Sequence, residues 1–206
     1  VRDLAKRKGL KVSEYGVFKG KKMVGGKSEE EIFEKVGLPY IIPELRKNDG
    51  EIEYGLKHKH FPKFVELRDI KGDLHSHSTY SDGKNSIEEM ARAFMAKGYE
   101  YFAVTDHSSV MGVTRGMGTK DIKKQWKEID QLNKKLKIKI LKGCEVDILK
   151  DGRLDFGDEV LKELDVVIIS AHLFNQLPER EQTERLITAI ENPYVSILAH
   201  PTGRLI

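Results

Sequence analysis

The chain has 206 residues, 39% of them hydrophobic, and a formal net charge of +3. No stretch approaches the roughly 18 apolar residues that a membrane span needs, so no membrane protein is expected, and Val1 opens no signal-peptide pattern. Cys144 is the only cysteine, which excludes an internal disulfide and is typical of the reducing cytoplasm.

Charge is distributed unevenly along the chain. Residues 1–71 hold 17 Lys and Arg against 12 Asp and Glu, and the remainder holds 19 against 21. A basic front half of this size is as typical of an ordinary solvated surface as of one that contacts nucleic-acid phosphates. Val1 also opens a charged, helix-like stretch without an initiator Met, so we expect an internal piece of a longer protein.

The first 68 residues predict a small α+β region. A short helix is expected over 2–8 and a strand over 11–18. Ser28 and Glu31 form a capping box ahead of a further helix. The pattern over 46–68 is weak, polar and mixed, and we place a domain junction there.

From Asp69 onward, strands and helices alternate. Strands are expected over 70–76, 99–105, 138–142, 165–170 and 194–199, and helices over 86–97, 119–136, 157–163 and 178–191. Repeated βα units imply parallel strands joined by right-handed crossovers. The apolar strands are bordered by amphipathic helices, so a barrel or part of one is the expected closure.

Histidines and carboxylates recur at the ends of these predicted strands. They are His75, His77, Asp82, His107, Glu145, His172 and His200. The active site of a βα barrel lies at the C-terminal ends of its strands. Two histidines spaced two apart on an extended segment also point to one face. We therefore expect all seven side chains to meet at one rim.

Neutral imidazoles and carboxylates are the ligands that divalent first-row metals prefer. Each residue alone has an ordinary structural interpretation, such as a helix cap or a strand end, and only their joint placement predicts a metal site. Seven ligands exceed the usual three of one catalytic zinc ion, so two or three ions that share a carboxylate are expected. Such clusters hydrolyse phosphate esters. The sequence contains no GxSxG elbow and no Walker A loop.

Other chemistry-bearing residues lie outside this set. His58 and His60 fall in the polar junction and are expected to be exposed. Cys144 is expected to be a small buried residue. Arg115 and Arg204 are candidate phosphate contacts, although a surface or structural role explains each equally well.

Five motifs over 72–206 carry a family resemblance: HSHSTYSDG, TDHS, GCEVDIL, SAH and AHPTGR. In this order they resemble the PHP (polymerase and histidinol phosphatase) domain, in the form fused to bacterial and archaeal family X DNA polymerases. The stretches RDLAKRKGLKVSEYGVF and EEEIFEKVGLPYIIPELR resemble the end of a polymerase beta-like thumb subdomain. The resemblance divides the chain into a thumb part, 1–45, a linker, 46–71, and an incomplete PHP domain, 72–206.

The resemblance implies an α/β fold with a distorted (β/α)7-type PHP barrel. The barrel would be truncated at its C-terminal end and preceded by the small α+β thumb segment. It also implies a site for two or three divalent ions, Mn²⁺ or Zn²⁺. The motifs assign His75 and His77 to the first ion, His172 and His200 to the second, and Asp82 and His107 to the third. Glu145 would bridge the first and second ions.

The residues with the implied catalytic role are His75, His77, Glu145, His172 and His200. The implied parent is a cytoplasmic DNA repair polymerase whose PHP domain hydrolyses phosphoesters at DNA 3′ ends. It would act as a 3′–5′ exonuclease or 3′-phosphatase and, as a further expectation, as an endonuclease at abasic sites. Its partner would be gapped or nicked DNA, and no membrane partner is expected. The polymerase part of the parent would use Mg²⁺.

The polymerase palm and fingers would lie upstream of this piece, which contains no polymerase catalytic residues, and the end of the barrel would lie downstream. Two other interpretations stay open. One is a stand-alone phosphatase of the histidinol-phosphatase type. The other is a non-catalytic PHP module that braces a polymerase.

Overall fold

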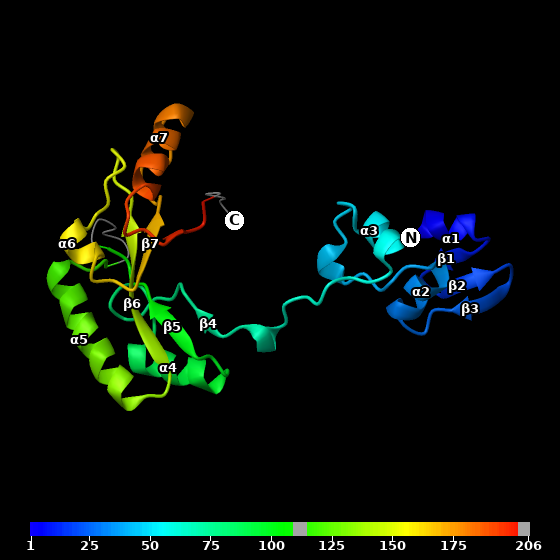
Figure 1. Ribbon diagram of the computed structural model, residues 1–206, viewed down its shortest axis with the longest axis horizontal. Helices are drawn as coiled ribbons and strands as arrows, with labels where there is room; N and C mark the ends of the chain where they lie inside the picture. Colours follow the sequence, from blue (N-terminus) through cyan, green and yellow to red (C-terminus); the bar gives the residue numbers. More distant parts are fainter. Residues whose placement is uncertain (109–114, 202–206) are drawn as a thin grey trace. The chain divides into compact units, whose positions relative to one another are not determined.

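The computed structural model describes residues 1–108 and 115–201. Its internal contacts divide the chain into two compact units, Val1–Val65 and Glu66–Ile206. Figure 1 labels their helices and strands. Within the described residues, no helix combines the length and the apolar character that crossing a membrane requires.

The first unit combines a three-stranded antiparallel sheet with short helices. Its elements in chain order are α1 (Arg2–Arg7), β1 (Lys11–Ser13), β2 (Gly16–Lys19), β3 (Lys22–Gly25), α2 (Glu29–Val36), the 3₁₀ turn η1 (Pro43–Leu45) and α3 (Glu51–His58). Their core consists of the buried side chains of Ala5, Phe33, Val36, Leu38 and Ile41.

The single strand predicted over 11–18 is a hairpin in the structure. Lys11 pairs with Phe18 and Ser13 with Gly16, so the chain reverses at Glu14 and Tyr15. The Ser13 hydroxyl accepts the backbone N–H of Tyr15, which favours the turn. Gly16 has a φ of 129°, a conformation that residues with a side chain rarely adopt. These two local preferences divide the segment 11–18 into two short strands.

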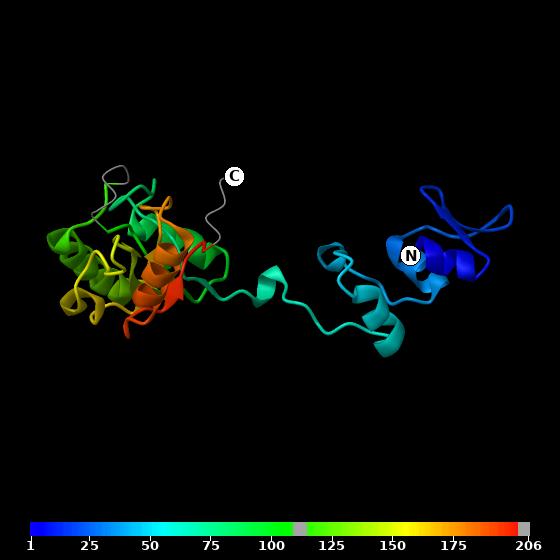
Figure 2. The ribbon, with the colours of Figure 1, turned by 90° about the horizontal axis from the view of Figure 1, so that it is seen from above.

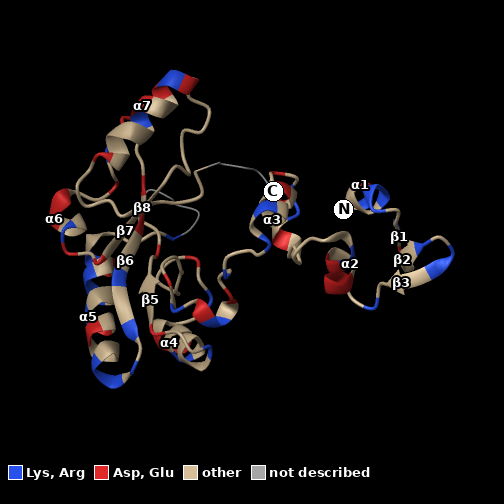
Figure 3. Cartoon of the chain, turned by 45° about the vertical axis from the view of Figure 1, so that its right-hand side comes forward, with Lys and Arg blue, Asp and Glu red and all other residues tan. Residues whose placement is uncertain are grey.

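Helix α2 begins where the capping motif predicts. The Ser28 hydroxyl accepts the backbone N–H of Glu31. The Glu31 carboxylate accepts the N–H groups of Gly26 and Lys27, at 3.0 and 2.8 Å, in place of the expected N–H of Ser28. These bonds, the Lys27 N–H first, lower the pKa of Glu31. The acidic first turn of α2 is visible in Figure 3 and suits the positive end of the helix dipole.

Helix α3 lies inside the segment 46–71 that the sequence suggested as a linker. Ile52 and Leu56, four residues apart on one helix face, pack against the core of the first unit, and Phe61 packs against it as well. The polar residues around this short apolar face hide its period in the sequence. The ordered first unit therefore extends to Val65.

The second unit is a curled parallel sheet with helices around it, seen in two views in Figures 1 and 2. Its elements are η2 (Leu67–Asp69), β4 (Gly72–Asp73), α4 (Ile87–Ala96), β5 (Tyr101–Val104), α5 (Thr119–Lys135), β6 (Lys139–Asp147), α6 (Asp158–Leu161), β7 (Val166–Ser170), α7 (Glu179–Ile190) and β8 (Ile197–Leu198). Neighbouring strands pair in parallel in the order β4-β5-β6-β7-β8. Parallel strands in sequential order and a curled sheet are the features of part of a βα barrel.

The predicted elements of this unit are present with shifted ends. Ser86 and Glu89 form the expected reciprocal capping box at the start of α4. Strand β6 runs five residues past the predicted end at Lys142, because its second half pairs with β7 from Gly143 to Asp147. Glu145 therefore lies within a strand and not after one, which fixes its side chain more firmly.

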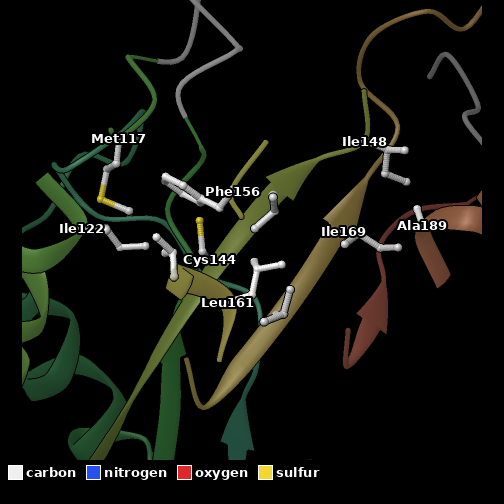
Figure 4. Close-up of a cluster of buried hydrophobic side chains, with 11 residues drawn as sticks. Met117, Ile122, Cys144, Ile148, Phe156, Leu161, Ile169 and Ala189 are labelled. Atoms are coloured by element: carbon white, nitrogen blue, oxygen red, sulfur yellow. The ribbon is translucent and has the colours of Figure 1, made fainter. Parts of the chain in front are cut away.

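The core lies between the sheet and its helices. All five residues of β7 are buried, as expected of a strand covered on both faces. Figure 4 shows Cys144 among Met117, Phe156 and Leu161. Burial raises the pKa of the Cys144 thiol well above its ordinary value, so it is an inert packing group, as predicted. A second cluster, which includes Phe102 and Ile129, joins α4 and α5 to β5 and β6.

Candidate metal centre

Glu145, 1% exposed, lies at the centre of five of the seven histidines. Three imidazoles surround its Oε2 atom: His75 Nε2 at 3.1 Å, His77 Nε2 at 3.3 Å and His107 Nδ1 at 3.3 Å. Because these rings come from the ends of β4 and β5, the curl of the sheet brings them to the side chain of β6.

The other carboxylate oxygen of Glu145 has its own neighbours. His200 Nε2 lies 2.9 Å from Oε1 and His172 Nε2 lies 3.4 Å from it. The Ser170 hydroxyl donates a hydrogen bond to the same oxygen. The two oxygens thus face histidines from opposite ends of the sheet, so this carboxylate could bridge two ions.

The five imidazole rings form a closed circle. Successive ring centroids lie 5.2 Å apart for His75 and His77, 4.5 Å for His77 and His107, and 5.2 Å for His107 and His172. The circle closes through His200, 5.1 Å from His172 and 6.0 Å from His75.

Asp82 lies beside this circle on the loop after His77. Its Oδ1 is 3.2 Å from His77 Nδ1, and its Oδ2 is 3.6 Å from His107 Nε2. Gly83 allows the loop to fold this tightly, since a Cβ there would lie 2.2 Å from the carbonyl oxygen of His77. The loop therefore adds a second carboxylate at the corner formed by His77 and His107.

Asp106 holds that loop in place and was missed by the sequence analysis. Its buried carboxylate accepts the N–H and hydroxyl of Ser78, at 2.8 and 2.6 Å, the hydroxyl of Ser81 at 2.5 Å and the amide of Gln125 at 2.7 Å. Because Asp106 directly precedes His107, one carboxylate couples the Asp82 loop to the end of β5. The adjacency of Asp106 to His107 in TDHS was the available signal.

Asp147 is the second carboxylate that the sequence analysis missed. It is 1% exposed, and His172 Nδ1 donates a hydrogen bond to its Oδ1 over 3.0 Å. Because an ionised carboxylate only accepts hydrogen bonds, this bond favours a proton on Nδ1 of His172, and Nε2 is the nitrogen that faces Glu145. The E-x-D spacing of Glu145 and Asp147 puts both side chains on one face of β6 and was the available signal.

The electrostatics of the centre follow from this crowding. Burial alone would raise the pKa of Glu145, but the imidazoles of His75 and His77 and the Ser170 hydroxyl outweigh it and hold that pKa well below its ordinary value. The bond to Asp147 raises the pKa of His172. Burial lowers the pKa of His107, which favours its neutral, metal-binding form.

The arrangement could hold shared cations. Two ligand atoms each about 2.1 Å from one ion lie about 3.0–3.4 Å apart in octahedral or tetrahedral geometry. The nitrogen–oxygen distances around Glu145 run from 2.9 to 3.4 Å. The buried Nδ1 atoms of His77 and His107 face carboxylate oxygens, Asp82 Oδ1 at 3.2 Å and Glu145 Oε2 at 3.3 Å.

Two triads have ligand atoms mutually within 4.8 Å: one of His75, Glu145 and His200, the other of His77, His107 and Glu145. Glu145 is common to both, as expected, but these triads pair the histidines differently from the family motif. The assignment of ligands to individual ions stays a prediction.

The remaining predicted residues lie elsewhere. His58 and His60 are exposed in the first unit, as expected. Arg115 lies in an exposed turn, and its contact with a phosphate stays a prediction. Arg204 lies outside the described residues.

Comparison with known proteins gives two family matches. Residues 1–47 match the family model of the DNA polymerase beta thumb, and residues 73–199 match that of the PHP domain. The chain is 48% identical over its whole length to "DNA polymerase/3'-5' exonuclease PolX" of Bacillus subtilis (strain 168), of which it covers 36%.

Phosphatase-like relatives match the second unit. The chain is 37% identical to a probable phosphatase of Thermoanaerobacter sp. (strain X514) over 63% of its own length and 53% of the relative. A probable phosphatase of Acetivibrio thermocellus is 35% identical over the same shares. The chain thus spans about a third of PolX and about half of these phosphatases.

Proposed function

We propose, from the premise that this chain belongs to the PHP domain family in its family X DNA polymerase form, that its second unit hydrolyses phosphoesters at DNA 3′ ends. The activity would be that of a 3′–5′ exonuclease or 3′-phosphatase and would extend to cleavage at abasic sites. Residues 1–45 would serve as the end of a thumb and residues from 72 onward as the hydrolytic domain, within a longer DNA repair enzyme.

The observation that carries this proposal is the spacing of the five imidazoles around Glu145. When bound there, divalent ions such as Mn²⁺ or Zn²⁺ supply Lewis acidity and an activated water for attack on phosphorus. The two oxygens of Glu145 would hold neighbouring ions, with His75 and His77 on one side and His172 and His200 on the other. Asp82 and His107 would complete the set at the loop corner.

The other residues of the centre prepare these ligands. Asp147 keeps the proton of His172 on Nδ1, so that Nε2 is free to ligate. Asp106 fixes the loop that carries Asp82 through Ser78 and Ser81. Holding ligands in place before substrate arrives reduces the reorganisation that the reaction requires.

DNA is the proposed substrate because a polymerase thumb precedes the hydrolytic domain and because PolX matches the entire chain. The names of the phosphatase relatives support a second candidate, hydrolysis of a small phosphomonoester by the same centre. The two candidates differ in substrate and share the metal chemistry.

The test compares His107→Ala with His60→Ala, a histidine exposed in the first unit. A 3′-labelled gapped duplex and para-nitrophenyl phosphate are each supplied at saturation with Mn²⁺ or Zn²⁺. We expect metal-dependent release from the DNA 3′ end by the wild type and by His60→Ala, and a loss of at least about a hundredfold in His107→Ala.

Other outcomes separate the alternatives. Faster hydrolysis of the small phosphomonoester than of DNA would identify a phosphatase. Bound metal without hydrolysis of either substrate would identify a bracing module. Equal rates for His107→Ala and the wild type would refute the role of that residue.

A further inference from the structure

Helix α3 and the segment that follows it carry four rings in a row. Tyr54 stacks on His58 with centroids 4.3 Å apart and on Phe61 with centroids 5.5 Å apart, with interplanar angles of 29° and 22°. Phe64 continues the row beyond Phe61 at 6.4 Å. We call His58, Tyr54, Phe61 and Phe64 the ring row.

The ring row is anchored at one residue and open at others. Phe61 packs against the core of the first unit, and Gly55 makes room for it, since a Cβ there would lie 3.3 Å from the Phe61 ring. Tyr54 is 40% exposed and His58 is also exposed. The row is therefore preformed, and its exposed end ring, His58, supported by Tyr54, offers aromatic surface to a ligand.

The segment that carries the row is basic, and acidic residues lie on either side of it, at Glu53 and Glu66. The segment 54–65 contains Lys57, Lys59 and Lys63 and no Asp or Glu. The side chains of these three lysines are exposed. A ligand with both flat apolar groups and negative charge matches this combination.

We propose that the ring row binds single-stranded DNA, with unpaired bases stacked on its rings and backbone phosphates at Lys57 and Lys59. Exposed aromatic rings among basic side chains are how proteins bind single strands without sequence preference. Every base has a face that stacks, whereas the paired bases of a duplex keep their faces covered.

A hollow of about 440 Å³ lies beside the row, and its charges indicate where the phosphates of a bound strand would lie. It is lined by Tyr54 and Phe61 but also by Glu44, Asp49 and Glu51. Carboxylates repel phosphate, so the uncharged bases belong at the rings and the phosphates on the lysine side.

This site goes beyond the proposed hydrolysis. It lies in the first unit, and residues 48–72 fall between the two family matches. Its ligand is a stretch of unpaired DNA, whereas the proposed reaction concerns a 3′ terminus at the metal centre. Binding can be measured with the metal chelated, so failure of one proposal leaves the other standing.

The experiment measures the affinity of the 206-residue chain for a fluorescent oligothymidylate in the presence of EDTA. Tyr54→Ala removes a ring that lies outside the buried core, and Tyr54→Phe keeps that ring. Tyr15→Ala is the matched control, because Tyr15 is a 75% exposed tyrosine of the same unit. Circular dichroism checks that each variant is folded.

We expect Tyr54→Ala to bind roughly tenfold more weakly, with Tyr54→Phe and Tyr15→Ala unchanged. Lys57→Gln combined with Lys59→Asn should weaken binding and lower the salt slope by about 0.7 for each lysine. Asn suits the left-handed backbone of Lys59, whose φ is 65°. The control with the same charge change is Lys134→Gln with Lys135→Gln, on the exposed last turn of α5.

Two results would overturn the inference. One is wild-type affinity in folded Tyr54→Ala together with an unchanged salt slope in the variant at Lys57 and Lys59. The other is tighter binding of a duplex of the same sequence than of the single strand, which would assign the lysines to double-stranded DNA.

Discussion

The H-x-H spacing occurs twice in this chain, once in each unit, and the two pairs have opposite environments. His58 ends helix α3, and His60 follows it, with its Nδ1 2.8 Å from the carbonyl oxygen of His58. Both are exposed. His75 and His77 follow β4, and both reach Oε2 of Glu145.

The two pairs differ in backbone conformation and in whether a buried carboxylate faces them. Lys59, between His58 and His60, has a left-handed backbone with a φ of 65° and turns the chain at the end of α3, whereas the rings of His75 and His77 approach the same carboxylate oxygen. The second unit also supplies a buried carboxylate at the point where its strands end. Spacing alone therefore does not make a metal site, and the predictions below test what the carboxylate adds.

Glu145→Gln should have the largest effect, because it removes the charge that the five imidazoles share while keeping the size of the side chain. Loss of an outer partner of a ligand costs about 10- to 100-fold in metal affinity, and loss of the central ligand should exceed this. Calorimetric titration with Zn²⁺ or Mn²⁺ measures the affinity. Added metal should raise the melting temperature of the wild type but not of the variant.

The control for this change is Glu159→Gln, an exposed carboxylate of the same unit. It should bind metal as the wild type does, and so should His58→Ala. Full metal affinity in Glu145→Gln would mean that the five imidazoles bind metal without the carboxylate. The buried carboxylate would then not explain the difference between the two H-x-H pairs.

Asp147→Asn should have an intermediate effect. The amide still fills the site but no longer fixes the proton of His172 on Nδ1, so part of the population presents the wrong nitrogen to the cation. We expect a loss of about 10- to 100-fold in metal affinity with the fold retained. Asp151→Asn is the matched control, because Asp151 is exposed and pairs with Arg153 at 2.7 Å. Equal affinities in the two variants would assign Asp147 a packing role only.

Much of this centre follows from sequence because parallel strands end at one rim. His107, His172 and His200 each follow an apolar run, and a curled sheet brings such positions together. The five histidines, Asp82 and Glu145 were therefore expected to meet, and the distances in the structure place them together. Their role as ligands stays a prediction that the metal titrations test.

The supporting carboxylates were not predictable in the same way. Asp106 is held by Ser78, Ser81 and Gln125, so its place beside His107 was a signal, but its role in fixing the Asp82 loop depends on contacts that only the fold brings together. Helix α3 was missed for a related reason. Its apolar face is short, and only contact with the core of the first unit makes it stable.

Glu29 is the exposed counterpart of Glu145 and should give the smallest effect. Its carboxylate accepts both terminal nitrogens of Arg46, at 2.9 and 2.7 Å, and the Tyr40 hydroxyl at 3.1 Å. These bonds, that of Arg46 first, lower the pKa of Glu29 below its ordinary value of 4.5. A lowered pKa in the folded state means stabilisation that is present above pH 4.5 and lost as the pH falls through the folded-state pKa.

The measurement is the melting temperature of the first unit's transition in the wild type and in Glu29→Gln, between about pH 6 and pH 3. The gap should be small, because solvent and salt screen an exposed pair, and it should close as the solution becomes acidic. Glu34→Gln, on the exposed side of the same helix, is the control for removing a carboxylate from α2. A gap at Glu29 that stayed constant down to pH 3 would show that the side chain acts through packing. The contrast with Glu145 would then be one of shape and not of charge.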